Sequence, residues 1–270
     1  MKTWHPYFIE LWHFFIANLR ASYFGAFLLS LFLVTEVVTV PLISRYDFIF
    51  LGAIGFQICA LLLRFEKIKE FFVILIFHVL ATGMELFKTH PAIGSWVYPD
   101  ANSALFVLAT VPLFSGFLYS AVGSYISRAF VFLKLSFENF PAYFHLWILA
   151  TLIYLNFFTH HFFYDIRYFL FAYVIIIFFK TRVDFQVYQR QRSMPFLLTA
   201  LLTAFFVWIA ENIGTFTSIW LYPNQLEYWH LVSLNKTGSW FLLLILSFAL
   251  VSIIYRDKLR PVPRPPAGDL

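Results

Sequence analysis

The sequence predicts an all-α polytopic membrane protein, with about eight transmembrane helices in two parallel four-helix repeats and an N-terminal interfacial helix. The first reason is composition: 61% of the 270 residues are hydrophobic and only 12% are charged, whereas a soluble domain is about half apolar and a quarter charged. The second is a series of apolar runs near the roughly 20 residues that cross a bilayer as a helix. The third is a motif that occurs twice.

Residues 1–21 form the first expected element, an amphipathic helix at the membrane interface. Trp4, Phe8, Trp12 and Phe15 follow helical spacing and share one face, which suits a helix lying in the interfacial plane. Glu10 interrupts the apolar run and no small-residue cleavage site follows, so the segment is not expected to be a secretory signal.

Eight apolar runs predict the membrane spans that follow. They cover residues 22–43, 46–64, 70–88, 103–127, 142–160, 162–180, 195–213 and 229–255. The first four spans make up a repeat over residues 22–134, and the last four a second repeat over residues 135–255. Residues 256–270 are polar and proline-rich, which predicts a disordered cytoplasmic tail.

The cations of the chain fix the expected orientation. Three or four follow the second, sixth and eighth spans and two follow the fourth, whereas the alternate connections carry one each: Arg45, Lys88, Arg167 and Lys236. Cytoplasmic connections are rich in Lys and Arg, so both termini are expected in the cytoplasm, as an even number of spans also requires. The net charge of +5 is therefore attributed to membrane orientation, and no nucleic-acid partner is expected.

The repeated motif is the strongest local signal. The first copy runs from Glu85 to Pro99 and reads E-x-x-x-T, then W-x-Y-P; the second runs from Glu211 to Pro223. Glu and Thr recur at an offset of 126 residues, and Trp, Tyr and Pro recur at 124. Four spans per unit give both copies the same orientation, so the repeats should be related by an axis along the membrane normal.

Glu85 and Glu211 are the candidate catalytic residues. Ionisable groups at membrane depth are costly, face the protein interior and are functional-site candidates by default. Equivalent positions in a parallel repeat approach the pseudo-twofold axis, so the two carboxyls are expected to share one cavity and to exchange a proton with a substrate. The alternative is that each Glu binds loop backbone at its helix end.

Aromatic residues of the motif are the candidate substrate-binding residues. Trp96, Tyr98, Trp220 and Tyr222 lie at the expected outer boundary. They form either part of the interfacial aromatic belt or the mouth of a cavity, over which the Tyr-Pro pair folds the loop as a lid.

Three further residues complete the candidate substrate-binding set. Thr89 and Thr215 lie one turn beyond each Glu and bond either that carboxyl or their own helix. His78 lies two turns before Glu85 on the same face, where it either relays protons or only packs. Glu36 is expected at a similar outer depth and is a candidate member of the same cluster.

No metal or cofactor is expected. His90, His160, His161 and His230 lie on the expected outer side, but none has a strong metal-ligand spacing. The chain contains no P-loop and no glycine-rich dinucleotide loop. Its one cysteine, Cys59, excludes an internal disulfide.

Two resemblances rest on the first motif copy. The stretch Thr82–His90 followed by Gly94–Pro99 resembles the signature of a bacterial membrane family, domain of unknown function 817 (DUF817), which implies a bacterial inner-membrane location and no particular activity. The order of Glu85, Thr89, Gly94, Trp96 and Tyr98 is also similar to a segment of the membrane-bound carotenoid hydratases. There the Thr is followed by Gly, and Tyr stands in place of Trp96.

These observations lead to two main functional hypotheses. The first is an intramembrane acid–base enzyme, or a binder, that acts on a lipophilic isoprenoid or lipid through Glu85 and Glu211. The second is a proton-coupled transporter or permease for small solutes. A purely structural or partner-binding role, in which the motifs lock the two halves together, is a third. Membrane lipids and a lipophilic small molecule are the expected partners.

Overall fold

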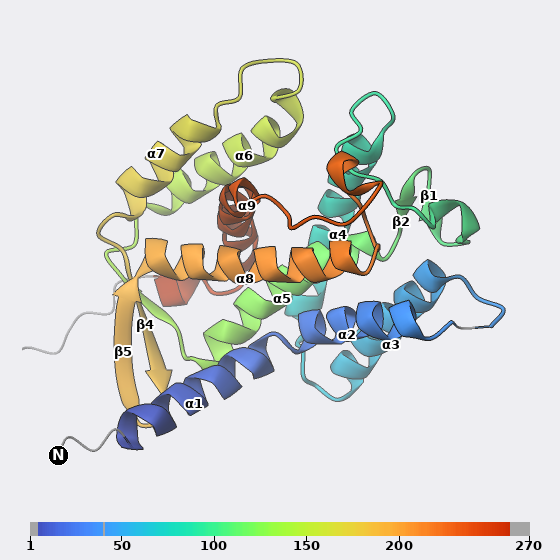
Figure 1. Cartoon of the computed structure of the whole chain (residues 1–270). Helices are drawn as coiled ribbons and strands as arrows, with labels where there is room; N and C mark the ends of the chain where they lie inside the picture. Colours follow the sequence, from blue (N-terminus) through green and yellow to red (C-terminus); the bar gives the residue numbers. More distant parts are fainter. Residues whose placement is uncertain (1–4, 40, 260–270) are drawn as a thin grey trace, which may run out of the picture.

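The computed structural model describes residues 5–39 and 41–259, and this part of the chain is mostly helical (Figure 1). Its α-helices are α1 (His5–Ala21), α2 (Tyr23–Val37), α3 (Arg45–Leu62), α4 (Ile68–Thr89), α5 (Ser115–Phe132), α6 (Tyr143–Thr159), α7 (Arg167–Phe178), α8 (Phe196–Phe216) and α9 (Asn235–Ser252). Short 3-10 turns lie at Ala101–Ser103, Pro223–Gln225 and Arg256–Leu259. The last turn is the described start of the expected tail; residues 260–270 lie outside the described residues.

The N-terminal helix α1 bends away from α2 by 73° at Ser22. Its apolar face stays open, since Phe8 and Trp12 are 75% and 56% exposed. The opposite side packs on α5 and is held by Glu10, which accepts hydrogen bonds from the Arg192 guanidinium. The interfacial position of this helix stays a prediction; Trp4, also expected on the apolar face, lies outside the described residues.

Helices α2 to α9 follow one another at the positions of the eight predicted apolar runs. Within the described ranges, four helices are long and apolar enough to cross a membrane: α3, α4, α8 and α9. The bent pair α1 and α2 would add a fifth span if it counts as one, and α6 and α7 are apolar but shorter. The predicted start of the fourth span, residue 103, is too early, because α5 begins only at Ser115. A hairpin of β1 (Val107–Leu108) and β2 (Val111–Pro112) precedes it.

A second sheet adds to the expected all-α architecture. Strand β3 (Ser136–Glu138) pairs antiparallel with β4 (Arg182–Val187), which forms a hairpin with β5 (Arg190–Pro195). The register sets Ser136 opposite Asp184 and Glu138 opposite Arg182. The two connections that carry this second sheet are basic connections, which the charge pattern assigns to one side. In Figure 1 the hairpin stands at the N-terminal end of α1.

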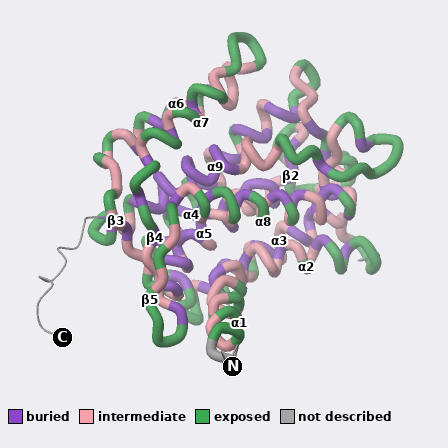
Figure 2. The backbone as a smooth tube through the Cα atoms, turned by 60° about the vertical axis from the view of Figure 1, so that its left-hand side comes forward, coloured by how far each residue is buried: buried purple, intermediate pink, exposed green. Residues whose placement is uncertain are grey.

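Helix α9 is the centre of the largest core. Nearly every residue from Phe241 to Ser252 is buried, and α9 contacts α4, α5, α6 and α8. Phenylalanine rings fill this core, with Phe130, Phe178 and Phe248 stacked against neighbouring rings. Figure 2 shows the buried residues gathered where the helices face one another.

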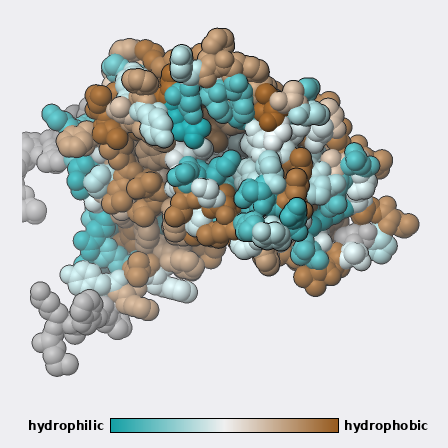
Figure 3. Space-filling view, turned by 45° about the horizontal axis from the view of Figure 1, so that its top comes forward, coloured by the Kyte–Doolittle hydropathy of each residue, from teal (hydrophilic) through white to brown (hydrophobic). Residues whose placement is uncertain are grey.

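Large apolar side chains also cover much of the surface. Leu62, Ile176 and Phe206 are 77%, 74% and 67% exposed, and Figure 3 shows broad hydrophobic areas between hydrophilic patches. Soluble monomers rarely expose contiguous apolar areas of this extent. The surface therefore suits lipid as the solvent of the helices.

Candidate functional site

The two W-x-Y segments meet in the folded chain. Val97 and Leu221, the middle residues of the two segments, form an antiparallel bridge with two N–H to O hydrogen bonds of 2.9 Å. One segment follows α4 and the other follows α8, so the bridge joins loops from distant parts of the sequence. It sets the motif side chains of both copies around one centre.

Glu85, in the last turns of α4, is 3% exposed and accepts three hydrogen bonds. Its Oε2 accepts from Trp96 Nε1 at 2.8 Å and from the Tyr98 hydroxyl at 2.9 Å. Its Oε1 accepts from the Tyr119 hydroxyl of α5 at 2.8 Å. All three partners are neutral aromatic donors, so this buried carboxyl is satisfied without a cation.

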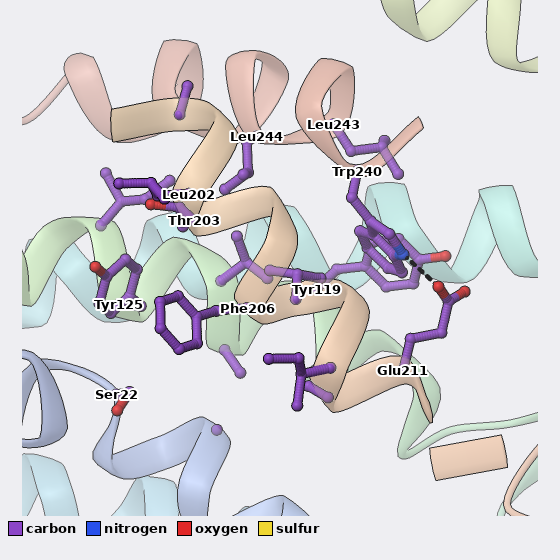
Figure 4. Close-up of a pocket in the computed structure, with 18 of the residues that line it drawn as sticks. Ser22, Tyr119, Tyr125, Leu202, Thr203, Phe206, Glu211, Trp240, Leu243 and Leu244 are labelled. Atoms are coloured by element: carbon purple, nitrogen blue, oxygen red, sulfur yellow. Dashed lines mark hydrogen bonds between the residues drawn. The ribbon is translucent and has the colours of Figure 1, made fainter. Parts of the chain in front are cut away.

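Glu211, near the end of α8, is also 3% exposed and has a related shell. Its Oε1 accepts from the Tyr222 hydroxyl, and its Oε2 accepts from Trp240 Nε1 of α9 at 2.8 Å (Figure 4). Each glutamate therefore binds one indole and at least one phenol. The two shells differ in that Trp220 makes no hydrogen bond to Glu211 but packs on Gly214, whereas Trp96 bonds Glu85 directly.

The two shells also contact each other. The rings of Trp96 and Tyr222 meet edge to face at 6.2 Å between centroids, and those of Tyr119 and Trp240 lie 6.1 Å apart. Burial, followed by the charge of the adjacent glutamate, raises the pKa of Tyr98 and of Tyr222 well above its ordinary value. Both phenols remain protonated and act as hydrogen-bond donors.

A cavity of about 1360 Å³ reaches this centre. Its wall includes both glutamates, Trp96, Tyr98, Trp220 and Tyr222, together with apolar residues of α1, α2, α5, α8 and α9. In Figure 4, Phe206 and Leu202 of α8 and Leu244 of α9 lie around its apolar part, while Trp240 and Glu211 lie at the other end. The cavity is thus largely apolar with a polar end at the motif.

Three candidate substrate-binding residues lie elsewhere. His78 packs against Gly116 and the Phe117 ring and does not line the cavity. Thr89 donates to the carbonyl of Glu85 at 2.9 Å and bonds the Thr110 hydroxyl at 2.7 Å. These contacts favour packing and helix-end roles, because short hydroxyl side chains bond readily to their own helix.

Thr215 and Glu36 are likewise outside the cavity wall. Thr215 donates to the carbonyl of Asn212 at 3.3 Å and accepts from Trp229 Nε1 at 3.1 Å. Glu36 forms an ion pair with Arg45 at 3.0 Å. The expected link between Glu36 and the Glu85 cluster is therefore wrong.

Four residues of the site were not identified from the sequence as members of it. Tyr119 and Trp240 lie in α5 and α9, in the fourth helix of each proposed repeat, and aromatic residues are too common in this chain for two of them to stand out. Lys88 and Lys236 line the polar end of the cavity. The sequence feature that could have identified these two lysines is the rarity of cations on the expected outer side. In the part of the chain that the structure covers, no group of three His, Cys, Asp or Glu residues could hold a metal ion.

Over residues 5–39 and 41–259, the fold is helical with four helices able to cross a membrane, and the site brings together Glu85 and Glu211, each bound by aromatic donors. The chain belongs to the family described as Protein of unknown function (DUF817), whose model matches residues 10–248 and so includes the whole site. It is 40% identical over 250 residues to the uncharacterized protein YoaT of Bacillus subtilis (strain 168), across 92% of this chain and 93% of that protein. No solved structure matches it. The family resemblance read from the first motif copy is confirmed.

Proposed function

We propose that this is a protein of the bacterial inner membrane whose helices α2 to α9 cross the bilayer in eight passes, with both termini in the cytoplasm. Support comes from the alternating cations, which collect in the connections that carry β3, β4 and β5. The α1 helix would lie along the same surface, with its open apolar face in the interface.

The two halves, α2–α5 and α6–α9, are proposed to be parallel repeats. The antiparallel bridge between Val97 and Leu221 pairs equivalent residues of the two motifs, as an approximate twofold axis requires. The third helix of each half carries the glutamate, and the fourth supplies Tyr119 or Trp240 to it. Each shell lies within its own half, and the two halves meet through the ring contacts of Trp96 with Tyr222 and of Tyr119 with Trp240.

Within this frame, the proposed function is binding of a lipophilic substrate in the cavity, with proton exchange at the glutamate pair. The observation that carries it is a buried carboxyl, Glu211, on the wall of a large apolar cavity. A carboxylic acid in such a place can protonate an alkene or another weakly basic group of an isoprenoid or lipid, and its carboxylate can take a proton back.

The two carboxyls differ in their capacity for this exchange. Glu85 already accepts three hydrogen bonds, whereas Glu211 accepts two. An ionised carboxylate offers about four lone-pair sites, so Glu211 keeps more of them for a substrate. Glu211 is thus the proposed proton-exchanging group, and Glu85 the paired carboxyl that holds the motif loops in place.

Mass spectrometry of lipophilic molecules that co-purify in mild detergent tests the proposal. Wild type is compared with Glu211→Gln and with Glu227→Gln, an exposed glutamate of the outer loop. A specific isoprenoid or lipid should be enriched with wild type and Glu227→Gln, and its amount or its double-bond state should change in Glu211→Gln. Bulk lipid alone in all three samples contradicts the proposal.

One observation favours proton-coupled transport as a second candidate. Buried carboxyls lie at both ends of α4, with Glu66 and Glu70 at its start and Glu85 at its end, and His78 between them has an unbonded Nδ1. Such a series can pass protons along a helix. Solute uptake driven by a pH gradient in proteoliposomes, lost in Glu70→Gln and kept in Glu227→Gln, would favour this function over the enzyme.

A further inference from the structure

The polar end of the cavity carries cations that the proposed acid–base chemistry does not use. Lys88 of α4, Lys236 of α9 and Arg167 at the start of α7 all line it. Arg167 and Lys236 are close enough to repel Lys88 electrostatically, while Asp165 attracts it. Like charges at one end of an apolar cavity are costly unless anions join them, and within the described residues Asp165 pairs only with Arg167.

Lys88 is the most buried of the three, at 5% exposure. Its Nζ lies 2.6 Å from His161 Nε2, 3.3 Å from His160 Nε2 and 4.5 Å from the centre of the Phe157 ring. His160 Nδ1 donates to the carbonyl of Asn156 at 2.7 Å, which leaves its Nε2 as an acceptor. The two imidazoles thus take two of the three ammonium protons, and the third remains for a ligand.

Lys236 lies over the motif aromatics at the cavity end. Its Nζ stands 4.1 Å from the centre of the Tyr222 ring and 5.9 Å from that of Trp96. Over residues 5–39 and 41–259, no carboxylate forms an ion pair with Lys88 or Lys236; Arg167 pairs with Asp165 at 2.9 Å. Glu85 and Glu211 also line this end, but their oxygens are bound by indoles and phenols.

We propose that this cluster is the headgroup site of the cavity and that the ligand is a phosphate monoester on a single long apolar chain. The inference rests on the proposed function, because it assigns the substrate class of that same cavity. A phosphate monoester carries about −1.5 to −2 charges at pH 7, which matches the two unpaired lysines better than a single carboxylate does. Its oxygens accept several charge-assisted hydrogen bonds at once.

The apolar part of the cavity fits the other end of such a molecule. Its volume of about 1360 Å³ exceeds the range of about 300–1,000 Å³ for drug-sized ligands, so a long chain has room. Phe8 and Trp12 of α1 and Phe206 of α8 line this part, and all three are exposed at the surface. A chain could therefore enter between α1 and α8 from the lipid side and run toward Lys88.

The test measures binding of dodecyl phosphate and of dodecanol to the full chain in nanodiscs of phosphatidylcholine. These probes differ only in the phosphate. Wild type should prefer the phosphate ester, and Lys88→Gln and Lys236→Gln should each weaken its binding by about tenfold or more, since each removes a charge-assisted contact. Dodecanol binding should not change. Lys69→Gln, at an exposed lysine on the other end of α4, is the control for general surface charge.

Several outcomes overturn the inference. Equal affinity for the two probes in wild type would show that the cations do not bind a headgroup. Competition by inorganic phosphate as strong as that of dodecyl phosphate would make the ligand a free anion rather than an amphiphile. If Lys88→Gln does not fold, the test uses Lys88→Arg and Lys236→Gln, since Lys236 is less buried than Lys88. Lys88→Arg should keep most of the preference.

The same experiment separates this inference from the proposed function. Retention of neither probe would contradict a lipophile-binding cavity altogether. Retention of dodecanol without a preference for the phosphate would overturn only the headgroup site. Glu227→Gln, at an exposed glutamate outside the cavity wall, should keep the phosphate preference.

Discussion

At the scale of single residues, the unusual feature is that neutral aromatic donors satisfy two buried carboxyls. Glu85 accepts hydrogen bonds from Trp96, Tyr98 and Tyr119, and Glu211 accepts them from Tyr222 and Trp240. An indole N–H only donates, so each carboxyl keeps an acceptor oxygen toward its tryptophan in either protonation state. The donors can thus hold the geometry while the proton count changes.

Removal of one phenol tests how strongly Glu85 depends on its shell. Tyr98→Phe deletes one of three hydrogen bonds to a buried carboxyl, and loss of a partner at a buried polar group costs about 1–3 kcal/mol. The free energy of unfolding in detergent should fall by roughly this amount. The control is Tyr188→Phe, whose ring is 58% exposed in the β4–β5 turn. Equal effects of the two substitutions would show that the Glu85 contact does not stabilise the fold.

His161 gives the cluster beside Lys88 a dependence on pH. Partial burial, the charge of Lys88 and the neighbouring His160 lower the pKa of His161 from its usual 6.5 to about 4. Between these values the unfolded chain binds more protons than the folded chain, so stability should fall as the pH drops from about 6.5 to about 4. Melting temperatures across this range should show the loss. His161→Asn should flatten the profile, and an unchanged slope would assign the loss to other groups.

At the scale of elements, the end of α8 is shaped by Gly214. A Cβ at this position would clash with the Trp220 ring, which packs directly on the helix backbone. Gly214→Ala should therefore destabilise the protein by about 1–3 kcal/mol, the usual cost of overpacking. It should also displace the second W-x-Y segment, which intrinsic tryptophan fluorescence would detect.

Gly55 of α3 is the matched control for this substitution. It is also a helix glycine, but nothing lies within 4 Å of an added Cβ. Gly55→Ala should keep or raise stability, by up to about 1 kcal/mol, because alanine is the better helix former. An equal loss of stability in both variants would mean that close packing of Trp220 on Gly214 is not the cause of the destabilisation.

The elements show where the sequence was sufficient for prediction. Apolar length placed a helix at each of eight runs, because long hydrophobic stretches favour helices whatever their neighbours are. The hairpin of β4 and β5 was missed, although Val183 and Val187 alternate with polar residues as strand positions do. The basic residues of this hairpin were interpreted only as evidence for the orientation of the chain in the membrane. Similarly, Pro112 within the fourth run is compatible with the hairpin that delays α5 until Ser115.

The candidate site was predictable to the extent that it is local. Glu85, Glu211 and the W-x-Y residues follow from the repeated motif and do line one cavity. Tyr119, Trp240 and Lys236 join them only through the packing of α4, α5, α8 and α9, whereas Lys88 lies three residues after Glu85 in the same helix. Helix contacts between residues far apart in the chain leave no short spacing in the sequence, so they could not be predicted from one chain.

At the scale of the whole molecule, the eight-pass arrangement makes a direct prediction about sidedness. The β4–β5 turn precedes α8 and the loop around Leu226 follows it, so they should lie on opposite sides of the membrane. Because the basic connection should be cytoplasmic, a cysteine at Leu226 should react with an impermeant maleimide on intact spheroplasts. A cysteine at Tyr188 should react only after permeabilisation. Both are placed in a Cys59→Ser background, since Cys59 is exposed. Reaction of both on intact cells would mean that α8 does not cross; a reversed pattern would invert the orientation and place the Lys88 cluster in the cytoplasm.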